Sequence, residues 1–261
     1  MCIRDRPNID DNKLTKKVSG INELNEPIDI DVVTEKPLTI YLNSQEIVTT
    51  MTLGDMPKEL SVGYLLNQNM INRKDVIEAI DYDEDIDVVV VRTKRKTNYE
   101  KKLSKKIRTS GCAVGTVYGD MMEIFYDIKL NDETKIKSSW MRKISKNIIE
   151  VPSLYLKAGA IHGCALCLND NILAYVEDVG RHNAVDKIAG WMFLNNIEGN
   201  DKIFYTTGRL TSEMIIKTVQ MEIPILLSRS GFTESGVNLA NEANLSLIGR
   251  MKGKRLSLIH I

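Results

Sequence analysis

The sequence predicts an α/β fold (α+β overall) with a parallel sheet in its carboxyl-terminal half. Two observations carry this prediction. Short apolar strands are expected at residues 202–206, 225–228 and 245–249, and helices at 211–222 and 233–244 fill the segments between them. Strands and helices that alternate at this spacing are typical of parallel strands joined by right-handed crossovers. Before them, two strands flank a turn at 169–171 and a helix covers about 182–194.

The amino-terminal half predicts a smaller α+β unit. Apolar and β-branched residues at 39–53 indicate a hairpin, and four consecutive valines within 87–92 indicate a buried strand. Pro57 is expected to open a helix that ends near Met70. Residues 7–27 are polar, and we expect them to be loosely ordered.

Charge is segregated between the two halves. Residues 75–87 hold seven acids and no base, whereas residues 92–108 hold nine bases and one acid. By composition alone, a solvated linker is the better interpretation. The alternative is that this basic segment attracts an anionic ligand to the residues that follow it, which include Cys112. A focused positive field raises the local concentration of anionic ligands.

The composition suits one large or two smaller globular domains, with 261 residues of which 43% are apolar and 27% charged. Bases and acids both total 35, so the overall charge indicates no partner. No apolar run is long enough for a membrane span, and no signal peptide is recognised. Four cysteines in so long a chain argue against a disulfide scaffold and favour a reducing cytoplasm.

Both ends of the chain are unusual. Residues 1–6 and 256–261 fit no predicted element and resemble translated adapter sequence. Cys2 and His260 are therefore left out of the functional argument. Three cysteines and two histidines remain to be explained.

Basic and hydroxyl residues follow three of the predicted strands. Ligands of parallel sheets bind at the carboxyl ends of the strands, so these residues are expected to share one site. Arginines, hydroxyls and glycines at several strand ends favour a phosphate-bearing ligand. The three segments are Thr207-Gly208-Arg209, Ser228-Arg229-Ser230-Gly231 and Arg250-Met251-Lys252-Gly253-Lys254-Arg255.

Cys112 is the first candidate for catalysis. A thiol that accepts and donates sulfur must be accessible, ionised near neutral pH and able to move. Gly111 and Gly115 give the backbone freedom on both sides, and the bases upstream, Arg108 nearest, favour the thiolate. The alternative is a small core residue, which most free cysteines are. The local sequence alone leaves the two interpretations about equal.

Cys164 and Cys167 form the only C-x-x-C pair of the chain. Such a pair can be a redox couple or half of a zinc site. No second C-x-x-C exists, and only His162 lies nearby. The segment also looks like a buried strand rather than the start of a helix. Plain packing is therefore the preferred interpretation.

Residues 177–187 crowd six charged or imidazole side chains around a strand-to-helix turn. A turn with a purely structural role needs a glycine and a capping residue, but it does not need so many charged and imidazole side chains. At a helix start, Arg181 and His182 are suited to meet a phosphate or a guanine edge. We assign a binding role to these two and to Asn183, with the acids Glu177 and Asp178 orienting them or accepting hydrogen bonds from a base. The last two residues, Asp186 and Lys187, also fit a salt-bridged helix entry.

The string Glu-Asp-Val-Gly-Arg-His-Asn-Ala-Val-Asp-Lys at 177–187 resembles the signature of the formate dehydrogenase accessory sulfurtransferases, the FdhD/NarQ family. Gly208-Arg209 with the helix that carries Glu213 and Met214 is similar to that family too, as are residues 35–43 and 60–66. The resemblance spans roughly residues 30–255. It implies a cytidine-deaminase-like carboxyl-terminal domain, with a central mixed sheet flanked by helices, and a small amino-terminal α+β domain.

The resemblance also implies a function. Sulfur would pass from a cysteine desulfurase, through a persulfide on Cys112, to a molybdenum or tungsten bis-(molybdopterin guanine dinucleotide) cofactor. The sulfurated cofactor would then enter formate dehydrogenase. Residues 250–255 match the stretch with which the family binds this cofactor. A homodimer is expected as well.

Two features depart from the family pattern. Gly115 stands where many members of the family carry a second cysteine, so Cys112 alone would have to carry the sulfur. This keeps open the alternative of a non-catalytic, cofactor-binding chaperone for formate dehydrogenase. The cofactor-binding stretch also runs into the suspect residues 256–261. Deaminase activity is not expected, because His162-Gly163-Cys164 lacks the glutamate of H-x-E and the chain has no P-C-x-x-C. A thiol-redox protein that uses Cys164 and Cys167 is the least favoured alternative.

We therefore predict a disordered or artefactual segment at 1–29, an amino-terminal α+β domain at 30–100, and a basic linker with the Cys112 loop at 101–138. A deaminase-like cofactor-binding domain at 139–255 and an artefactual tail at 256–261 follow. The expected partners are a cysteine desulfurase, the catalytic subunit of formate dehydrogenase and a second copy of the chain; no resident metal, nucleic acid or membrane is expected, and the location is the cytoplasm. Cys112 is the predicted catalytic residue, and the predicted cofactor-binding residues are Arg181, His182, Asn183, Gly208, Arg209, Arg250, Met251, Lys252, Gly253, Lys254 and Arg255.

Overall fold

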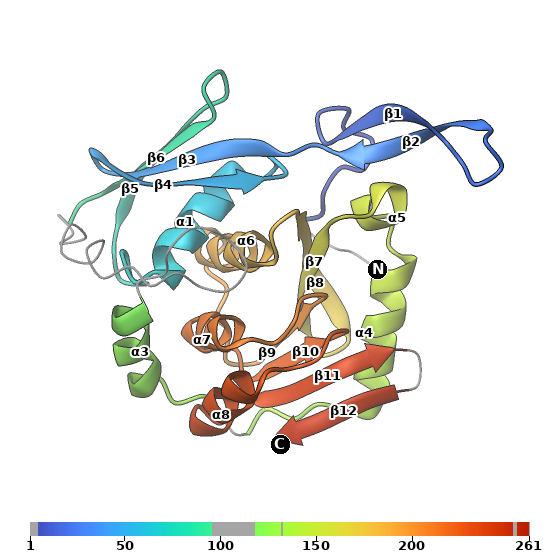
Figure 1. Ribbon diagram of the computed structural model, residues 1–261. Coiled ribbons are helices and arrows are strands. Elements are labelled where there is room, and N and C mark those ends of the chain that lie inside the picture. Colours follow the sequence, from blue (N-terminus) through green and yellow to red (C-terminus); the bar gives the residue numbers. More distant parts are fainter. Residues whose placement is uncertain (1–4, 96–117, 132, 253–254, 261) are drawn as a thin grey trace.

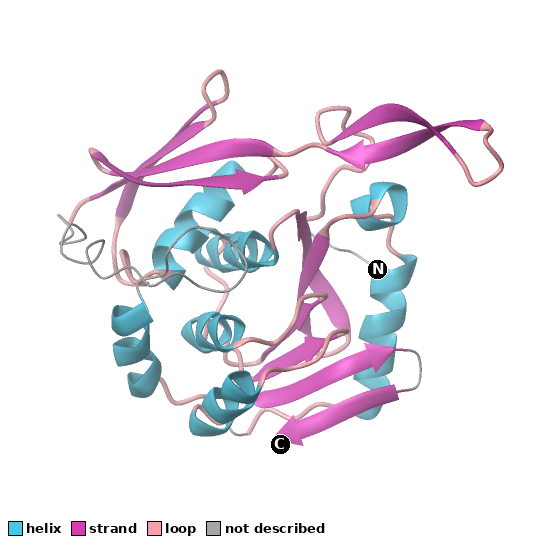
Figure 2. Cartoon of the chain, in the orientation of Figure 1, coloured by secondary structure: helices cyan, strands magenta, loops and turns pink. Residues whose placement is uncertain are grey.

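A computed structural model describes residues 5–95, 118–131, 133–252 and 255–260 (Figure 1). The largest sheet in this part of the chain is mixed, as expected (Figure 2). Its strands follow the order β12-β11-β10-β9-β7-β8, in which the middle strands β9, β10 and β11 are parallel and the others antiparallel. The strands are β7 (His162–Leu168), β8 (Asn171–Asp178), β9 (Lys202–Thr206), β10 (Ile225–Ser228), β11 (Ser246–Lys252) and β12 (Arg255–His260). The predictions for 202–206 and 225–228 match β9 and β10 residue for residue.

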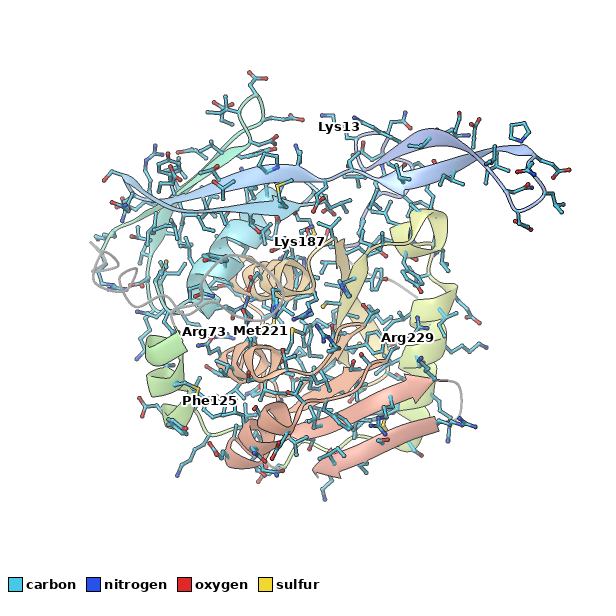
Figure 3. All side chains as sticks on the ribbon, in the orientation of Figure 1. Lys13, Arg73, Phe125, Lys187, Met221 and Arg229 are labelled. Atoms are coloured by element: carbon cyan, nitrogen blue, oxygen red, sulfur yellow. The ribbon has the colours of Figure 1, made fainter. Side chains whose placement is uncertain are left out.

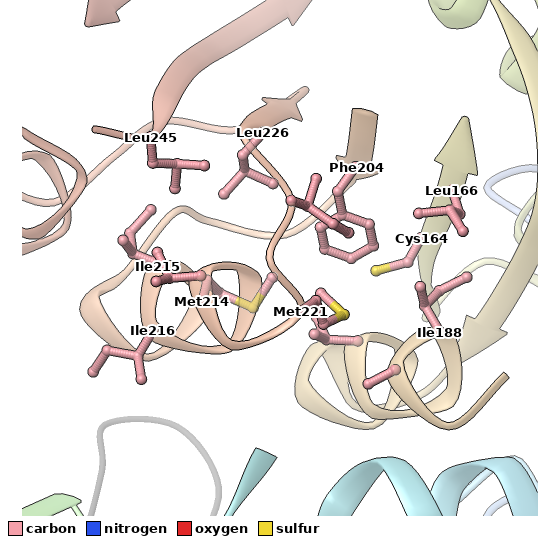
Figure 4. Packing of buried hydrophobic residues seen from close by; sticks show 14 of the residues in the cluster. Cys164, Leu166, Ile188, Phe204, Met214, Ile215, Ile216, Met221, Leu226 and Leu245 are labelled. Atoms are coloured by element: carbon pink, nitrogen blue, oxygen red, sulfur yellow. The ribbon is translucent and has the colours of Figure 1, made fainter. Parts of the chain in front are cut away.

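Helices cover both faces of this mixed sheet. On one face, α3 (Tyr118–Asp127), α6 (Arg181–Leu194), α7 (Ser212–Gln220) and α8 (Glu234–Glu242) contribute to one apolar core. On the other face, α4 (Ser138–Glu150) packs Met141, Ile144 and Ile148 against the sheet. Figure 4 shows the first core, in which Cys164 lies among Leu166, Ile188 and Phe204. The α/β class with a mixed sheet flanked by helices is confirmed, while the likeness to cytidine deaminases stays a prediction.

The amino-terminal unit is a four-stranded sheet with one helix. Its order is β4-β3-β6-β5, formed by β3 (Lys36–Leu42), β4 (Gln45–Thr52), β5 (Ile77–Asp83) and β6 (Val88–Thr93). Helix α1 (Pro57–Asn67) packs on this sheet through Leu60, Val62 and Leu65. The predicted hairpin, helix start and valine strand are all present.

Two glycines bring α1 of this unit into backbone contact with α6. A Cβ atom at Gly63 would lie 1.7 Å from the carbonyl oxygen of Asp186, and one at Gly190 would lie 1.8 Å from that of Glu59. No larger residue fits without moving the helices apart, because ordinary contacts begin near 3.4 Å. The amino-terminal unit is therefore fixed directly against the helix that carries Arg181 and His182.

The expected disorder at 7–27 is wrong for residues 15 onward. β1 (Thr15–Ile21) and β2 (Pro27–Val33) form an antiparallel hairpin. Its turn is closed by Asn22, whose side-chain oxygen accepts hydrogen bonds from the backbone N–H groups of Leu24 and Glu26, and by Asn25 in the left-handed conformation. The polar composition suggested disorder, whereas local turn chemistry decides the structure.

Two further expectations are corrected. The acidic segment 75–87 is not a plain linker, because β5 pairs with β6 and its neighbours Asp75 and Asp87 form ion pairs with Arg95 and Lys36. Residues 256–260, which were expected to fit no element, belong to strand β12, antiparallel to β11. An edge strand with unpaired backbone groups recruits an extended segment that follows it. No helix in the described ranges is long and apolar enough to span a membrane.

Candidate anion-binding site

The three predicted strand ends converge at one edge of the mixed sheet. The Ser228 hydroxyl donates to the carbonyl oxygen of Gly208 at 2.6 Å, and the backbone N–H of Arg250 donates to the carbonyl oxygen of Ser230 at 2.7 Å. The backbone N–H of Leu210 donates to Gly231 at 2.9 Å. We call this surface the basic edge: residues 206–209, 228–231, 250–252 and 255, with Arg181. The hydrogen bonds join segments that are far apart in the sequence, as the parallel topology predicts.

Arg181 reaches the basic edge from the amino terminus of α6. A Cβ atom at Gly208 would lie 3.2 Å from Cδ of Arg181, so the glycine lets the arginine pass close to the loop after β9. The Thr206 hydroxyl accepts a hydrogen bond from the backbone N–H of Gly208 at 3.1 Å. Arg181 and Gly208, which the sequence proposed separately, are thus direct neighbours.

A pocket of about 760 Å³ opens at one end of the basic edge. Arg250 lies over the ring of Phe232, with its guanidinium carbon 5.8 Å from the ring centroid, and this cation–π contact holds it at the pocket. None of the described residues that line the pocket is acidic, so an anion placed there would meet four cations and two hydroxyls. The lining residues are Arg229, Ser230, Gly231, Arg250, Lys252, Arg255, Leu256 and Ser257; Arg229 is labelled in Figure 3.

Two histidines, His162 of β7 and His182 of α6, lie near Arg181. His162 starts β7, which runs antiparallel to β9, and its Nδ1 is 3.4 Å from the hydroxyl of Thr207. Burial lowers its pKa, and Arg181 and Arg209 lower it further. For His182, burial lowers the pKa to about 2, with Lys217 and Arg181 adding to the effect. Both imidazoles are therefore neutral at pH 7, so they add no charge of their own to the field of the arginines.

The two acids at the start of the 177–187 string face inward. Asp178 is fully buried and accepts hydrogen bonds from the Thr52 hydroxyl at 2.5 Å and from the side chain of Asn183 at 2.9 Å. Glu177 accepts from the backbone N–H groups of Leu154 and Tyr155, at the start of α5 (Leu154–Ala158). These carboxylates fix the turn and its neighbours, so neither points toward a ligand at the basic edge.

Asn183 is engaged by the amino-terminal unit. Its side-chain amide donates both to Asp178 and to the carbonyl oxygen of Met51, and its oxygen accepts from Thr50. Both amide hydrogens are thus used within the protein. The predicted cofactor contact of Asn183 remains untested, but its observed bonds join β4 to the start of α6.

Lys187 is fully buried between two carboxylates (labelled in Figure 3). Its ammonium group lies 2.5 Å from Asp55 and 2.7 Å from Asp178, and it donates to the carbonyl oxygen of Glu177 at 3.0 Å. Although burial opposes the charged form, the two carboxylates raise the pKa of Lys187 above its ordinary value. The structural role that the sequence left open for Lys187 is the observed one.

Asp186, the residue before Lys187 in α6, forms a second buried pair. Lys217 of α7 contacts both carboxylate oxygens of Asp186 at 2.9 Å, and Asn67 of α1 donates to the same carboxylate at 2.6 Å. Glu213 connects this pair to the first turn of α6, because it lies 3.9 Å from Lys217 and 3.4 Å from Nε2 of His182. The sequence analysis missed Lys217 as a core residue; its only signal was a position four residues after Glu213 on a buried helix face.

Cys164 and Cys167 are packing residues of the core. Both are completely buried, and they belong to cores on opposite faces of the mixed sheet. Burial raises the pKa of Cys164 to about 12 and raises that of Cys167 as well. Two thiols on opposite faces cannot share a metal ion or form a disulfide. The packing interpretation therefore holds, and the redox and zinc alternatives do not.

Several predicted residues lie outside the part of the chain that the structure describes: Cys112, Gly115, Gly253 and Lys254. Met251 is described and is 5% exposed, with its side chain in the core on the α4 face rather than at the pocket. Arg250 and Lys252 on either side of it do line the pocket. His162 was considered only as a zinc or deaminase residue, yet the antiparallel course of β7 places it at the basic edge.

Fold and site together define the class of protein: a mixed α/β protein whose central parallel strands end in arginine-rich loops. A sequence model of the FdhD/NarQ family matches residues 33–260. The chain therefore belongs to the FdhD/NarQ family.

Individual relatives agree with this assignment. A sulfur carrier protein FdhD of Listeria monocytogenes serotype 4b (strain F2365) is 30% identical over 246 residues, which cover 89% of this chain and 90% of the relative. A protein of the same name from Bacillus subtilis (strain 168) is 29% identical over 219 residues, covering 84% of each chain. The crystal structure of a protein assigned as a formate dehydrogenase accessory protein, from Desulfotalea psychrophila, matches the fold with a TM-score of 0.76 at 24% identity, over 95% of this chain and 96% of that one.

Proposed function

We propose that this chain is a sulfurtransferase that serves formate dehydrogenase. Its membership of the FdhD/NarQ family supports the proposal, as do relatives named sulfur carrier protein FdhD. In this proposal Cys112 carries the sulfur, and the molybdenum or tungsten bis-(molybdopterin guanine dinucleotide) cofactor is the substrate that receives it. The single observation that favours this substrate is the basic edge, where hydrogen-bonded loops present arginines, hydroxyls and glycine backbone around one pocket.

The transfer has two steps with defined bonds. The Cys112 thiolate attacks the outer sulfur of a persulfide on a cysteine desulfurase, so a new S–S bond forms on Cys112 and the donor leaves as a thiolate. The outer sulfur of the Cys112 persulfide then passes to the substrate, and Cys112 is again a thiolate. Delivery of that sulfur as sulfide takes two electrons, which a reduced metal centre of the substrate supplies. Gly115 makes this a one-cysteine cycle within the loop.

The residues of the basic edge fit a substrate with two guanine dinucleotides. Pyrophosphate oxygens are multivalent acceptors, and planar guanidinium groups bind them through paired hydrogen bonds. Arg229, Arg250, Lys252 and Arg255 supply the charge at the pocket. The neutral His162 offers a ring nitrogen at the same edge, beside Thr207.

Persulfide mapping tests the transfer. The full chain is incubated with a cysteine desulfurase and cysteine, and persulfides are located by mass spectrometry. We expect the added sulfur on Cys112 and none on Cys164 or Cys167, which are buried. The Cys112→Ala variant should fail to restore formate dehydrogenase activity in cells that lack their own accessory protein.

The same cells separate the proposal from its rival, a chaperone that carries the substrate without transferring sulfur. If Cys112→Ala restores activity, the chaperone is correct and the sulfurtransferase is not. Binding is measured separately with guanosine diphosphate as the probe. Arg250→Gln should weaken it about tenfold or more, because a charge-assisted hydrogen bond is worth about 1.5–3 kcal/mol. Lys143→Gln, an exposed cation on α4, is the matched control.

A further inference from the structure

Phe232 lies beside the pocket of the basic edge, in the loop that joins β10 to α8. The guanidinium carbon of Arg250 is 5.8 Å from the centroid of its ring, which is within the range of a cation–π contact. None of the described residues that line the pocket is acidic, so an aromatic ring rather than a carboxylate of the lining holds this cation. A carboxylate would compete with a bound anion for the guanidinium, whereas a ring leaves the positive charge uncompensated.

Phe232 is itself fixed by its surroundings. Its backbone forms a bridge to Leu210, with a hydrogen bond on either side of it. The N–H of Leu210 donates to the carbonyl oxygen of Gly231 at 2.9 Å, and the N–H of Thr233 donates to the carbonyl oxygen of Leu210 at 3.1 Å. The partly buried ring packs against the apolar core that α6, α7 and α8 share. Backbone and core together therefore hold the ring in one place.

Gly249 of β11 makes room for this ring. A Cβ atom at Gly249 would lie 2.4 Å from Cε1 and 2.9 Å from Cδ1 of Phe232, where ordinary contact begins near 3.4 Å. It would also lie 3.0 Å from the carbonyl oxygen of Ser230. The ring thus occupies the space that a side chain at position 249 would need, and any larger residue there displaces it.

Arg250 follows Gly249 directly, and its backbone is in the left-handed conformation with a φ of 57°. This conformation is uncommon for a residue other than glycine and is strained, so the surroundings must impose it. The N–H of Arg250 donates to the carbonyl oxygen of Ser230 at 2.7 Å, which anchors it. Its Nε is 3.9 Å from where a Cβ atom at Gly231 would lie, so the side chain runs beside the loop that precedes Phe232. Backbone and ring together direct the guanidinium to the pocket.

An arginine that is fixed before a ligand arrives binds it more tightly. A mobile arginine loses rotamer entropy when a ligand orders it, and this loss weakens binding by roughly twofold to tenfold. A planar guanidinium can lie against an aromatic ring and still donate hydrogen bonds in its own plane to phosphate oxygens. The contact with Phe232 is therefore compatible with a bound pyrophosphate.

We propose that Phe232 is a positioning residue for the anionic substrate: its ring holds Arg250 at the pocket before binding and leaves the charge of Arg250 free for a pyrophosphate group. This inference rests on the proposed function, since it takes the basic edge as the site of the guanine dinucleotide substrate. Phe232 acts through Arg250 and not by touching the substrate.

Calorimetric titration of the full chain with guanosine diphosphate tests the role of the ring. F232L keeps an apolar side chain but removes the aromatic face, and it should raise the dissociation constant roughly twofold to tenfold. F232Y keeps the ring and should bind within about twofold of the parent chain. G249A retains Phe232 but displaces its ring, so it should weaken binding as F232L does. F193L replaces another partly buried phenylalanine, in the last turns of α6, and should bind as the parent does.

A double-mutant cycle separates positioning from a general structural role. F232L should weaken binding no further when R250Q is already present, because its effect passes through Arg250. The positioning role is overturned if F232L binds like the parent, if it costs the same factor with and without R250Q, or if F232Y fails to retain binding. Weak binding by R250Q with an unchanged F232L overturns this role alone. If R250Q binds as tightly as the parent, the substrate site assigned to the basic edge is wrong, and the role of Phe232 falls with it.

Discussion

The contact between α1 and α6 gives a sharp prediction for Gly63→Ala. The added Cβ atom would lie 1.7 Å from the carbonyl oxygen of Asp186, where ordinary contact begins near 3.4 Å. The helices must therefore separate by about 1.7 Å at this point. The nearest atoms are backbone atoms of Asp186 and Gly190, which cannot move aside as the end of a side chain could. The hydrogen bond from Asn67 to Asp186, now 2.6 Å long, lies within the same contact and is stretched beyond hydrogen-bonding range.

The magnitude follows from three contributions. Overpacking of a tight contact costs about 1–3 kcal/mol. Loss of a hydrogen bond to a charged group costs about 1.5–3 kcal/mol. Alanine in a helix interior returns about 1 kcal/mol relative to glycine. The net loss in free energy of unfolding is about 1.5–5 kcal/mol, which lowers the melting temperature of a chain of this size by roughly 3–20 °C.

Thermal unfolding followed by circular dichroism measures this effect. Gly20→Ala is the matched control, because a Cβ atom at Gly20 has nothing within 4 Å. Its melting temperature should stay within about 2 °C of the parent, as for most surface substitutions. If Gly63→Ala also melts within about 2 °C of the parent, the two units are not held in backbone contact and the reasoning is wrong.

Three other predictions follow from the buried charges and thiols. Lys187→Met removes the cation between two buried carboxylates and should lower the free energy of unfolding by about 3–5 kcal/mol in denaturant titrations, whereas Lys143→Met at the surface should cost less than about 1 kcal/mol. Burial and nearby cations hold the pKa of His182 at about 2, below its ordinary 6.5, so the unfolded chain binds an extra proton as the pH falls below 6.5. Stability should then fall by about 1.4 kcal/mol per pH unit from this group, and His182→Asn should flatten that slope; an unchanged slope contradicts the assignment. Iodoacetamide should leave Cys164 and Cys167 unmodified in the native chain and alkylate both after denaturation, as judged by peptide mass spectrometry.

The positions of charges explain why α6 is central to the candidate site. Its first turn presents Arg181 to the basic edge, and its next turns carry Asp186 and Lys187 into two buried ion pairs. Those pairs reach α7 through Lys217 and the amino-terminal unit through Asp55. A buried pair is costly to break from one side, so the helix is held in one position. The arginine at its start is thereby fixed relative to the loops after β9 and β10.

The sequence by itself determined the alternation of strands and helices after residue 160. Strands β9 and β10 and helix α6 lie where apolar periodicity predicts, because a strand buried on both faces and a helix between two strands each leave a strong local pattern. The same pattern placed Arg209, Arg229 and Arg250 at carboxyl ends of strands. Parallel topology then required them to lie at one edge of the sheet, which the structure confirms.

Only the tertiary structure decided which charged residues of the 177–187 string are buried in ion pairs and hydrogen bonds within the protein. Asp178, Asp186 and Lys187 stand in the same short charged segment as Arg181 and His182. The local sequence does not show which of these side chains are buried. Their partners are Thr52, Asp55, Asn67 and Lys217, which lie in other elements and are brought near by the packing of α1 and α7 against α6. Burial depends on such long-range contacts, because a side chain is removed from water by residues distant in the sequence.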